Sequence, residues 1–142
     1  MSAILQDISE KLQKGKMKEV AELVKQAVAD GIQPLTILNE GLMPGMDIIG
    51  ERFKKNDIFI PEVLIAARAM AAGTDVLRPL LVGDQMEEKG TVVIGTIKDD
   101  LHDIGKNLVR MMMESKGRNV IDLGNSVPPA KYIEAAAKHN AD

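Results

Sequence analysis

The chain has 142 residues, 45% of them hydrophobic, which suffices for one ordinary domain or two small units with a real core. It has no cysteine, so disulfides, thiolate metal sites and cysteine nucleophiles are excluded. Its net charge of −3, with mixed signs along the chain, lacks the basic patch or stripe of a nucleic-acid-binding protein. The amino terminus is no signal peptide and no apolar stretch approaches a membrane span, so we expect a cytoplasmic protein that binds neither nucleic acid nor membranes.

The first part of the chain has the pattern of an all-α unit. Apolar residues recur at helical spacing, and glycine or proline stands at the boundaries of four predicted helices, over residues 2–14, 16–30, 33–55 and 60–83. Pro44 lies between two glycines inside the third helix and predicts a bend or break near residues 43–45. Four consecutive helices with short links indicate an antiparallel four-helix bundle over residues 1–83.

The pattern changes after a polar, glycine-ended segment at residues 84–90, which we interpret as a linker. The segments that follow predict a strand, a helix, a second strand and a second helix, over residues 91–97, 103–117, 119–124 and the final stretch to residue 142. This order indicates an α/β unit with a parallel sheet over residues 91–142. Two parallel strands do not make an independent domain, so we expect either a fragment of a longer protein or a sheet completed by another chain.

A histidine stands among aspartates directly after the first predicted strand, in the stretch "IKDDLHDIGKNLV" at residues 97–109. In open α/β sheets, ligands bind beyond the carboxyl ends of the strands. His102 could ligate a metal there, with Asp100 holding its other ring nitrogen and Gly105 permitting a close approach to the backbone. A structural or accidental role for this Asp-x-His-x-x-Gly pattern is the alternative. Because a bare zinc ion needs three or four protein ligands, a single imidazole better suits a metal already held by a macrocycle.

The stretch "DLHDIGKNLV" resembles the cobalamin-binding motif of methionine synthase and of corrinoid proteins in anaerobic methyltransferase systems. The resemblance extends to "GLMPGMDIIGERFKKNDIFIPEVLIAARAM" at residues 41–70, which is similar to the helical cap of that family, and to the strands and helices at residues 92–109 and 120–142. It implies a helical cap followed by the start of a flavodoxin-like or Rossmann-like cobalamin-binding domain, apparently truncated before its third strand.

The resemblance also implies a cofactor, cobalamin or a related corrinoid, and roles for individual residues. His102 would be the lower axial cobalt ligand, with Asp100 hydrogen-bonded to its second ring nitrogen. Gly105 would make room for the displaced nucleotide tail, and Asp103 and Ile104 join the predicted cofactor-binding set as neighbours in the motif. Phe59, in the turn before the fourth helix, would face the corrin from the cap.

The function implied is that of a non-catalytic methyl carrier. The corrinoid would accept a methyl group from a one-carbon substrate through one methyltransferase and pass it to a second methyltransferase or acceptor, with a reductive activase as a further partner. Methanol, methylamines and methoxylated aromatics remain open as donors. The alternatives are a receiver-like signalling module, suggested by adjacent Asp99 and Asp100, a corrinoid-based sensor, and a structural protein without cofactor. The open sheet edge suggests possible self-association.

Overall fold

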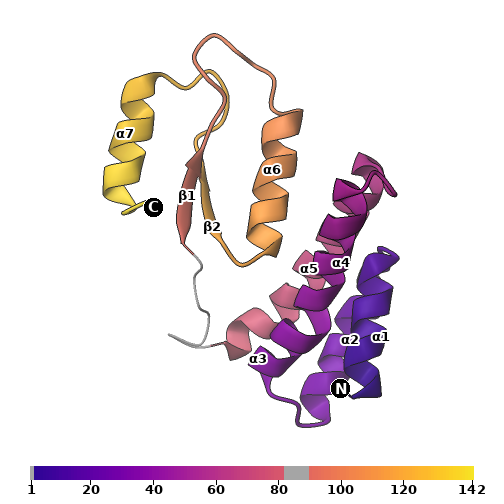
Figure 1. The fold of residues 1–142 in the computed structure, drawn as a ribbon. Coiled ribbons are helices and arrows are strands. Elements are labelled where there is room, and N and C mark those ends of the chain that lie inside the picture. Colours follow the sequence, from indigo (N-terminus) through magenta and orange to yellow (C-terminus); the bar gives the residue numbers. More distant parts are fainter. Residues whose placement is uncertain (1, 82–89) are drawn as a thin grey trace. The chain divides into compact units, whose positions relative to one another are not determined.

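The computed structural model describes residues 2–81 and 90–142, and the chain divides into two compact units, Met1–Met86 and Glu87–Asp142 (Figure 1). Of the predicted linker at residues 84–90, only Gly90 lies within the described residues. The two units are described separately below. Among the described residues, no helix has both the length and the apolar character needed to cross a membrane.

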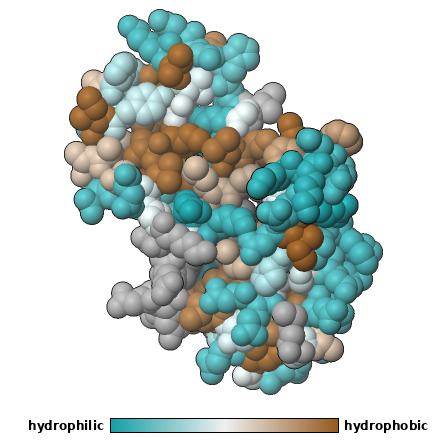
Figure 2. All heavy atoms as spheres, in the orientation of Figure 1, coloured by the Kyte–Doolittle hydropathy of each residue, from teal (hydrophilic) through white to brown (hydrophobic). Residues whose placement is uncertain are grey.

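The first unit is a helical bundle. Its elements are α1 (Ala3–Gln13), α2 (Met17–Ala29), α3 (Pro34–Thr36), η1 (Ile37–Leu42), α4 (Met43–Lys54), α5 (Ile60–Leu77) and η2 (Arg78–Leu80). Helix α1 packs against α2, η1 and α4, and α5 packs against α2 and α4. Aliphatic and methionine side chains fill the core, and the largest buried ones are Ile8, Leu12, Val20, Val24, Ile37, Leu42, Met46, Ile49, Val63 and Leu77. Hydrophilic residues cover α1 on the face seen in Figure 2, as expected for a helix with one apolar stripe.

The predicted break in the third helix is instead a widened turn. Helix α3 continues through η1, a π-helical segment over Ile37–Leu42, into α4 without leaving the helical path. Within this segment the backbone N–H of Met43 donates to the carbonyl of Leu38, five residues earlier. Pro44 explains the position, because its ring crowds the preceding turn and it has no N–H to donate. The irregularity therefore lies one turn before the proline.

The second unit follows the predicted order, with β1 (Thr91–Ile94), α6 (Ile104–Ser115), β2 (Asn119–Asp122) and α7 (Pro129–Lys138). The strands pair in parallel, with Thr91 opposite Asn119 at one end and Ile94 opposite Asp122 at the other. Figure 1 shows α6 and α7 on opposite sides of the two strands. This architecture confirms the predicted fold class, an α/β unit preceded by a helical bundle.

Both strands are shorter than the sequence pattern predicts. The continuous ladder ends at Ile94 and Asp122, and only a single parallel bridge, between Ile97 and Val127, follows it. Beyond the ladder the two chains are joined by the loop contacts described below. The carboxyl ends of both strands therefore open into one polar loop cluster, the place where ligands bind in parallel sheets.

Candidate functional site

The loop between β1 and α6, residues 95–103, is held against the β2–α7 loop by backbone hydrogen bonds. The N–H of Thr96 donates to the carbonyl of Gly124 at 2.9 Å, and the N–H of Val127 donates to the carbonyl of Thr96 at 2.8 Å. Nearer the tip, the N–H of Ser126 donates to the carbonyl of Asp100 at 2.9 Å. The loop is therefore ordered by the neighbouring segment rather than by its own side chains alone.

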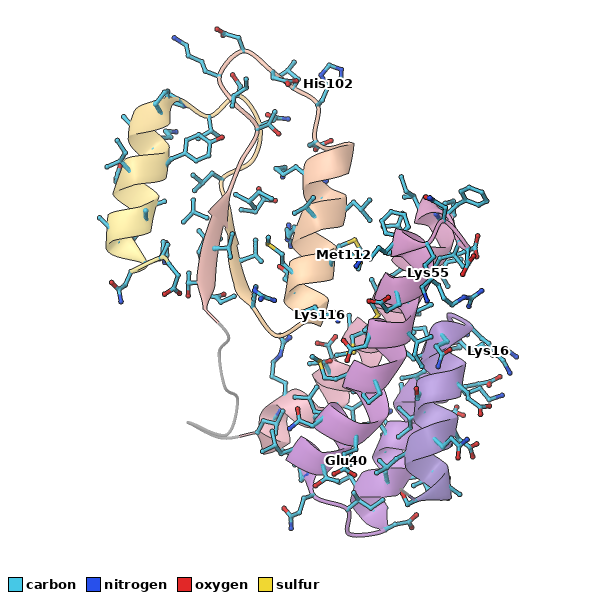
Figure 3. All side chains as sticks on the ribbon, viewed as in Figure 1. Lys16, Glu40, Lys55, His102, Met112 and Lys116 are labelled. Carbon is cyan, nitrogen blue, oxygen red and sulfur yellow. The ribbon has the colours of Figure 1, made fainter. Side chains whose placement is uncertain are left out.

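His102 lies at the outer end of this loop, and its ring projects away from the unit's sheet (Figure 3). Its Nδ1 atom lies 2.6 Å from Oδ1 of Asp100, and its backbone N–H donates to the same oxygen at 2.9 Å. The hydroxyl of Thr96 donates to the carbonyl of His102 at 2.8 Å. The backbone and the Nδ1 side of the ring are thus both held, while the side chain is 98% exposed.

The contact with Asp100 favours Nε2 as the ring nitrogen of His102 that is available to a ligand. A carboxylate at Nδ1 favours the proton on that nitrogen, which leaves the lone pair on Nε2. In the part of the chain that the structure describes, Nε2 has no hydrogen-bonding partner. The backbone N–H of His102, and then its ring, hold the pKa of the Asp100 carboxyl below its ordinary value, so the carboxylate stays charged beside the imidazole.

The predicted residues after His102 form the start of α6. Asp103 stands at the helix N-cap, where its carbonyl accepts the N–H of Asn107 at 2.8 Å and its side chain makes no capping bond. Ile104 is the first helical residue. A methyl group added at Gly105 would meet no atom within 4 Å, so the surface beside the histidine is open at that point. Another molecule could therefore approach the backbone closely at this point.

Phe59 belongs to the helical unit, where it is the N-cap residue of α5. Its backbone N–H donates to the carboxylate of Glu62 at 3.2 Å, and its side chain is 70% exposed. Most of this aromatic ring is therefore accessible to solvent within the described part of the helical unit. Its role toward a cofactor remains a prediction.

A charged cluster below the loop was missed by the sequence reasoning. Asp122, the last residue of β2, accepts hydrogen bonds from Lys106 at 2.7 and 2.8 Å and from Arg110 at 3.1 Å. The side chains of Lys106 and Asp122 are only 8% and 17% exposed. Lys106 and Arg110 are four residues apart on one face of α6, a spacing that could have signalled a shared acidic partner.

The donor set fits a metal that arrives with most of its ligands. Among the residues that the structure describes, no group of three or more histidine, cysteine or acidic side chains could hold a metal ion. A single oriented imidazole with a free Nε2 can occupy one axial position of a metal whose in-plane ligands come from a macrocycle. Asp99 and Asp100, which suggest the receiver-like alternative, belong to no such group among the described residues, and Oδ1 of Asp100 is engaged by His102.

Comparisons with known proteins agree with this chemistry. Two family models, each described as a B12 binding domain, match residues 4–78 and 90–142. Trimethylamine corrinoid protein 1 of Methanosarcina acetivorans is 42% identical over 118 residues, which are 82% of this chain and 55% of the relative. The dimethylamine corrinoid protein of Methanosarcina barkeri is 37% identical over 140 residues, which are 98% of this chain and 65% of the relative.

A solved structure shares the fold. The methanol:cobalamin methyltransferase complex MtaBC from Methanosarcina barkeri contains a chain that matches with a TM-score of 0.88 and 31% identity, over 97% of this chain and 53% of that one. The chain thus spans between half and two thirds of the length of these similar proteins. The predicted cofactor is confirmed by the family models. The chain belongs to the family of corrinoid proteins with B12-binding domains, and its cofactor is cobalamin or a related corrinoid.

Proposed function

We propose that this chain is a methyl carrier whose His102 ligates the cobalt of the corrinoid from its lower face. The observation that carries the proposal is the exposed imidazole whose Nδ1 is held by Asp100 at 2.6 Å while Nε2 is unengaged. The bound corrinoid supplies a metal centre that takes up a methyl group and releases it again. The chain's own part is to hold that centre, set its axial ligand and control its access to water.

Each predicted site residue has a place in this proposal. Asp100 fixes the tautomer of His102 and raises its basicity as a ligand. Gly105, with open space beside it, admits the nucleotide tail of a corrinoid, flanked by the backbone of Asp103 and Ile104. Phe59 supplies apolar cover from the helical unit, consistent with its exposed ring.

The proposed partners are a substrate-specific methyltransferase, an acceptor methyltransferase and a reductive activase. Similar proteins named for trimethylamine and dimethylamine favour a methylated amine as the donor, and the solved complex pairs a corrinoid chain with a methyltransferase. We further propose that residues 1–83 act as a cap domain, joined by a linker at 84–90 to the cobalamin-binding α/β unit, 91–142. The open edge of β1 offers a site for self-association in the same scheme.

The test of axial ligation uses cobinamide, a corrinoid without a nucleotide base, so that any axial nitrogen ligand must come from the protein. The wild-type chain and His102→Ala are titrated with cobinamide and followed by visible spectroscopy, and the cobalt(II) forms are examined by EPR. Wild type should show the nitrogen superhyperfine splitting of an axial imidazole, and His102→Ala should not. Identical spectra for the two proteins would contradict the proposal.

The transfer step needs a separate experiment. The corrinoid-loaded chain is first reduced to the cobalt(I) state with a low-potential reductant such as titanium(III) citrate. It is then incubated with a trimethylamine methyltransferase and trimethylamine carrying ¹³C-methyl groups, and the label on the corrinoid is followed by NMR. Label should appear with wild type, and omission of the methyltransferase is the control. Ligation without labelling would contradict the methyl-carrier proposal and leave the sensor alternative open.

A further inference from the structure

The carboxylate of Asp122 joins two segments that both support the histidine loop. One segment is α6, whose Lys106 ammonium contacts both carboxylate oxygens and whose Arg110 contacts Oδ2. The other is the β2–α7 loop, where the N–H of Gly124 donates to Oδ1 of Asp122 at 2.8 Å. This single, mostly buried carboxylate is therefore the meeting point of a helix start and a loop start.

The first route from Asp122 to the histidine runs through α6. The helix begins at Ile104, two residues after His102, and Lys106 lies in its first turn. A cation in the first turn opposes the helix dipole, so its position gains nothing for the helix itself. The contact with Asp122 accounts for it, because that contact ties the first turn of α6 to the end of β2.

The second route runs through the backbone. Gly124, whose N–H is held by Asp122, accepts the N–H of Thr96 at 2.9 Å through its carbonyl. The hydroxyl of Thr96 in turn donates to the carbonyl of His102 at 2.8 Å. A continuous chain of hydrogen bonds thus leads from Asp122 to the backbone of the proposed ligand. The loop is anchored both behind and in front of His102.

We infer that Asp122 is a positioning residue for His102, acting through Lys106 on one side and through Gly124 and Thr96 on the other. The inference rests on the proposed function, in which His102 ligates the corrinoid cobalt. Asp122 itself contacts neither His102 nor the open surface at Gly105 in the described structure. Its contribution is to keep the loop in a binding geometry before the corrinoid arrives, which lowers the ordering cost of ligation.

The test is Asp122→Asn, which keeps the size of the side chain and an acceptor for Gly124 but removes the charge that pairs with Lys106. Cobinamide is titrated into the apo-protein, and the cobalt(II) complex is examined by EPR. We expect the association constant to fall about tenfold, at the low end for residues that support a ligand from outside the first coordination sphere. At subsaturating cobinamide, the fraction of the cobalt(II) signal that shows nitrogen splitting should fall accordingly. Lys106→Gln, which breaks the same pair from the helix, should act in the same direction.

Two control variants separate positioning from stability. Val120→Ala weakens the same strand by removing apolar packing and leaves the charged cluster intact. Glu114→Gln removes the other carboxylate bound by Arg110, at 3.0 Å, and leaves Asp122 in place. All variants are compared at a temperature below their unfolding transitions, where circular dichroism shows that they are folded. Under these conditions both controls should bind cobinamide with the affinity of wild type. Loss of affinity in Val120→Ala equal to that in Asp122→Asn would overturn the inference.

The failures of the proposed function and of this inference can be told apart. If wild type and His102→Ala bind cobinamide equally, histidine ligation fails and the inference falls with it. If binding depends on His102 but Asp122→Asn and Lys106→Gln bind like Val120→Ala, only the positioning role is refuted.

Discussion

Asp100 holds His102 through a single oxygen. Two substitutions of this aspartate, Asp100→Asn and Asp100→Ala, should weaken cobalt ligation to different extents. Oδ1 accepts both the backbone N–H, at 2.9 Å, and the ring Nδ1–H, at 2.6 Å. Asp100→Asn leaves a carbonyl oxygen for these donors and removes only the charge, which accounts for roughly half the strength of such bonds. Asp100→Ala removes the acceptor itself. We therefore expect losses of about tenfold and about a hundredfold in the association constant for cobinamide.

The assay for these variants is the cobinamide titration read by visible spectroscopy, with His102→Ala as the limit of complete loss. Asp99→Asn is the matched control, because it removes an equal charge one residue away and no hydrogen bond of the Asp99 side chain is seen in the described loop. Asp99 has a φ of +69°, a conformation that asparagine tolerates well, so the control should fold. The role given to Asp100 would be refuted if wild type, Asp100→Asn and Asp100→Ala bound cobinamide with equal affinity while His102→Ala lost this binding.

Three further predictions concern stability and access. The contact with Lys106, followed by the N–H of Gly124, lowers the pKa of Asp122 below its ordinary 3.8. The ionised carboxylate therefore stabilises the folded α/β unit fully above that value, and this stabilisation is lost as pH falls through the lowered pKa. Urea unfolding of the α/β unit should show this loss of stability in acid for wild type but not for Asp122→Asn. Gly105→Ala should leave the melting temperature unchanged or slightly raised, because a methyl group meets open space within a helix, while hydroxocobalamin binding weakens. Gly15→Ala should destabilise the helical unit by about 2–4 kcal/mol in chemical unfolding, because the glycine has a φ of +70° and a Cβ there would lie 1.9 Å from Cγ2 of Ile65.

The architecture could be predicted because it depends on patterns local in the sequence. Helical spacing of apolar residues marked the bundle, and a β-branched run followed by an amphipathic helix marked the parallel unit. The loop that carries His102 could be placed for the same reason, since it lies between a predicted strand and a predicted helix. The strand lengths could not be predicted, because the ladder ends where loop residues such as Ser126 and Asp100 take over the hydrogen bonds, and those residues lie far apart in the chain.

The charged cluster shows why the rest of the site was not predictable. Lys106 and Asp122 are 16 residues apart in the sequence. From the sequence alone, each would be interpreted as a solvent-exposed charge at the end of a helix or strand. Only the parallel pairing of β1 with β2, which sets α6 beside the end of β2, brings them together. The π-helical turn before Pro44 depends likewise on packing that the sequence does not display, since a break and a widened turn both accommodate a proline.

His102 must be exposed to meet the cofactor and must also be held in one conformation, and the arrangement around it meets both requirements. A ligand that must meet a large cofactor has to be exposed, yet an exposed hydrogen bond such as the one between His102 and Asp100 contributes little to stability and does not by itself fix a loop. Order must therefore come from groups that water reaches less easily. That need is met one layer below the ligand by the backbone bonds of Thr96 and by the Lys106–Asp122 pair, whose side chains are 8% and 17% exposed, respectively. Changes to surface charges near His102 should therefore alter the strength of the bond between His102 and cobalt. Changes to Thr96, Lys106 or Asp122 should instead alter the fraction of molecules whose loop has the conformation that binds the corrinoid.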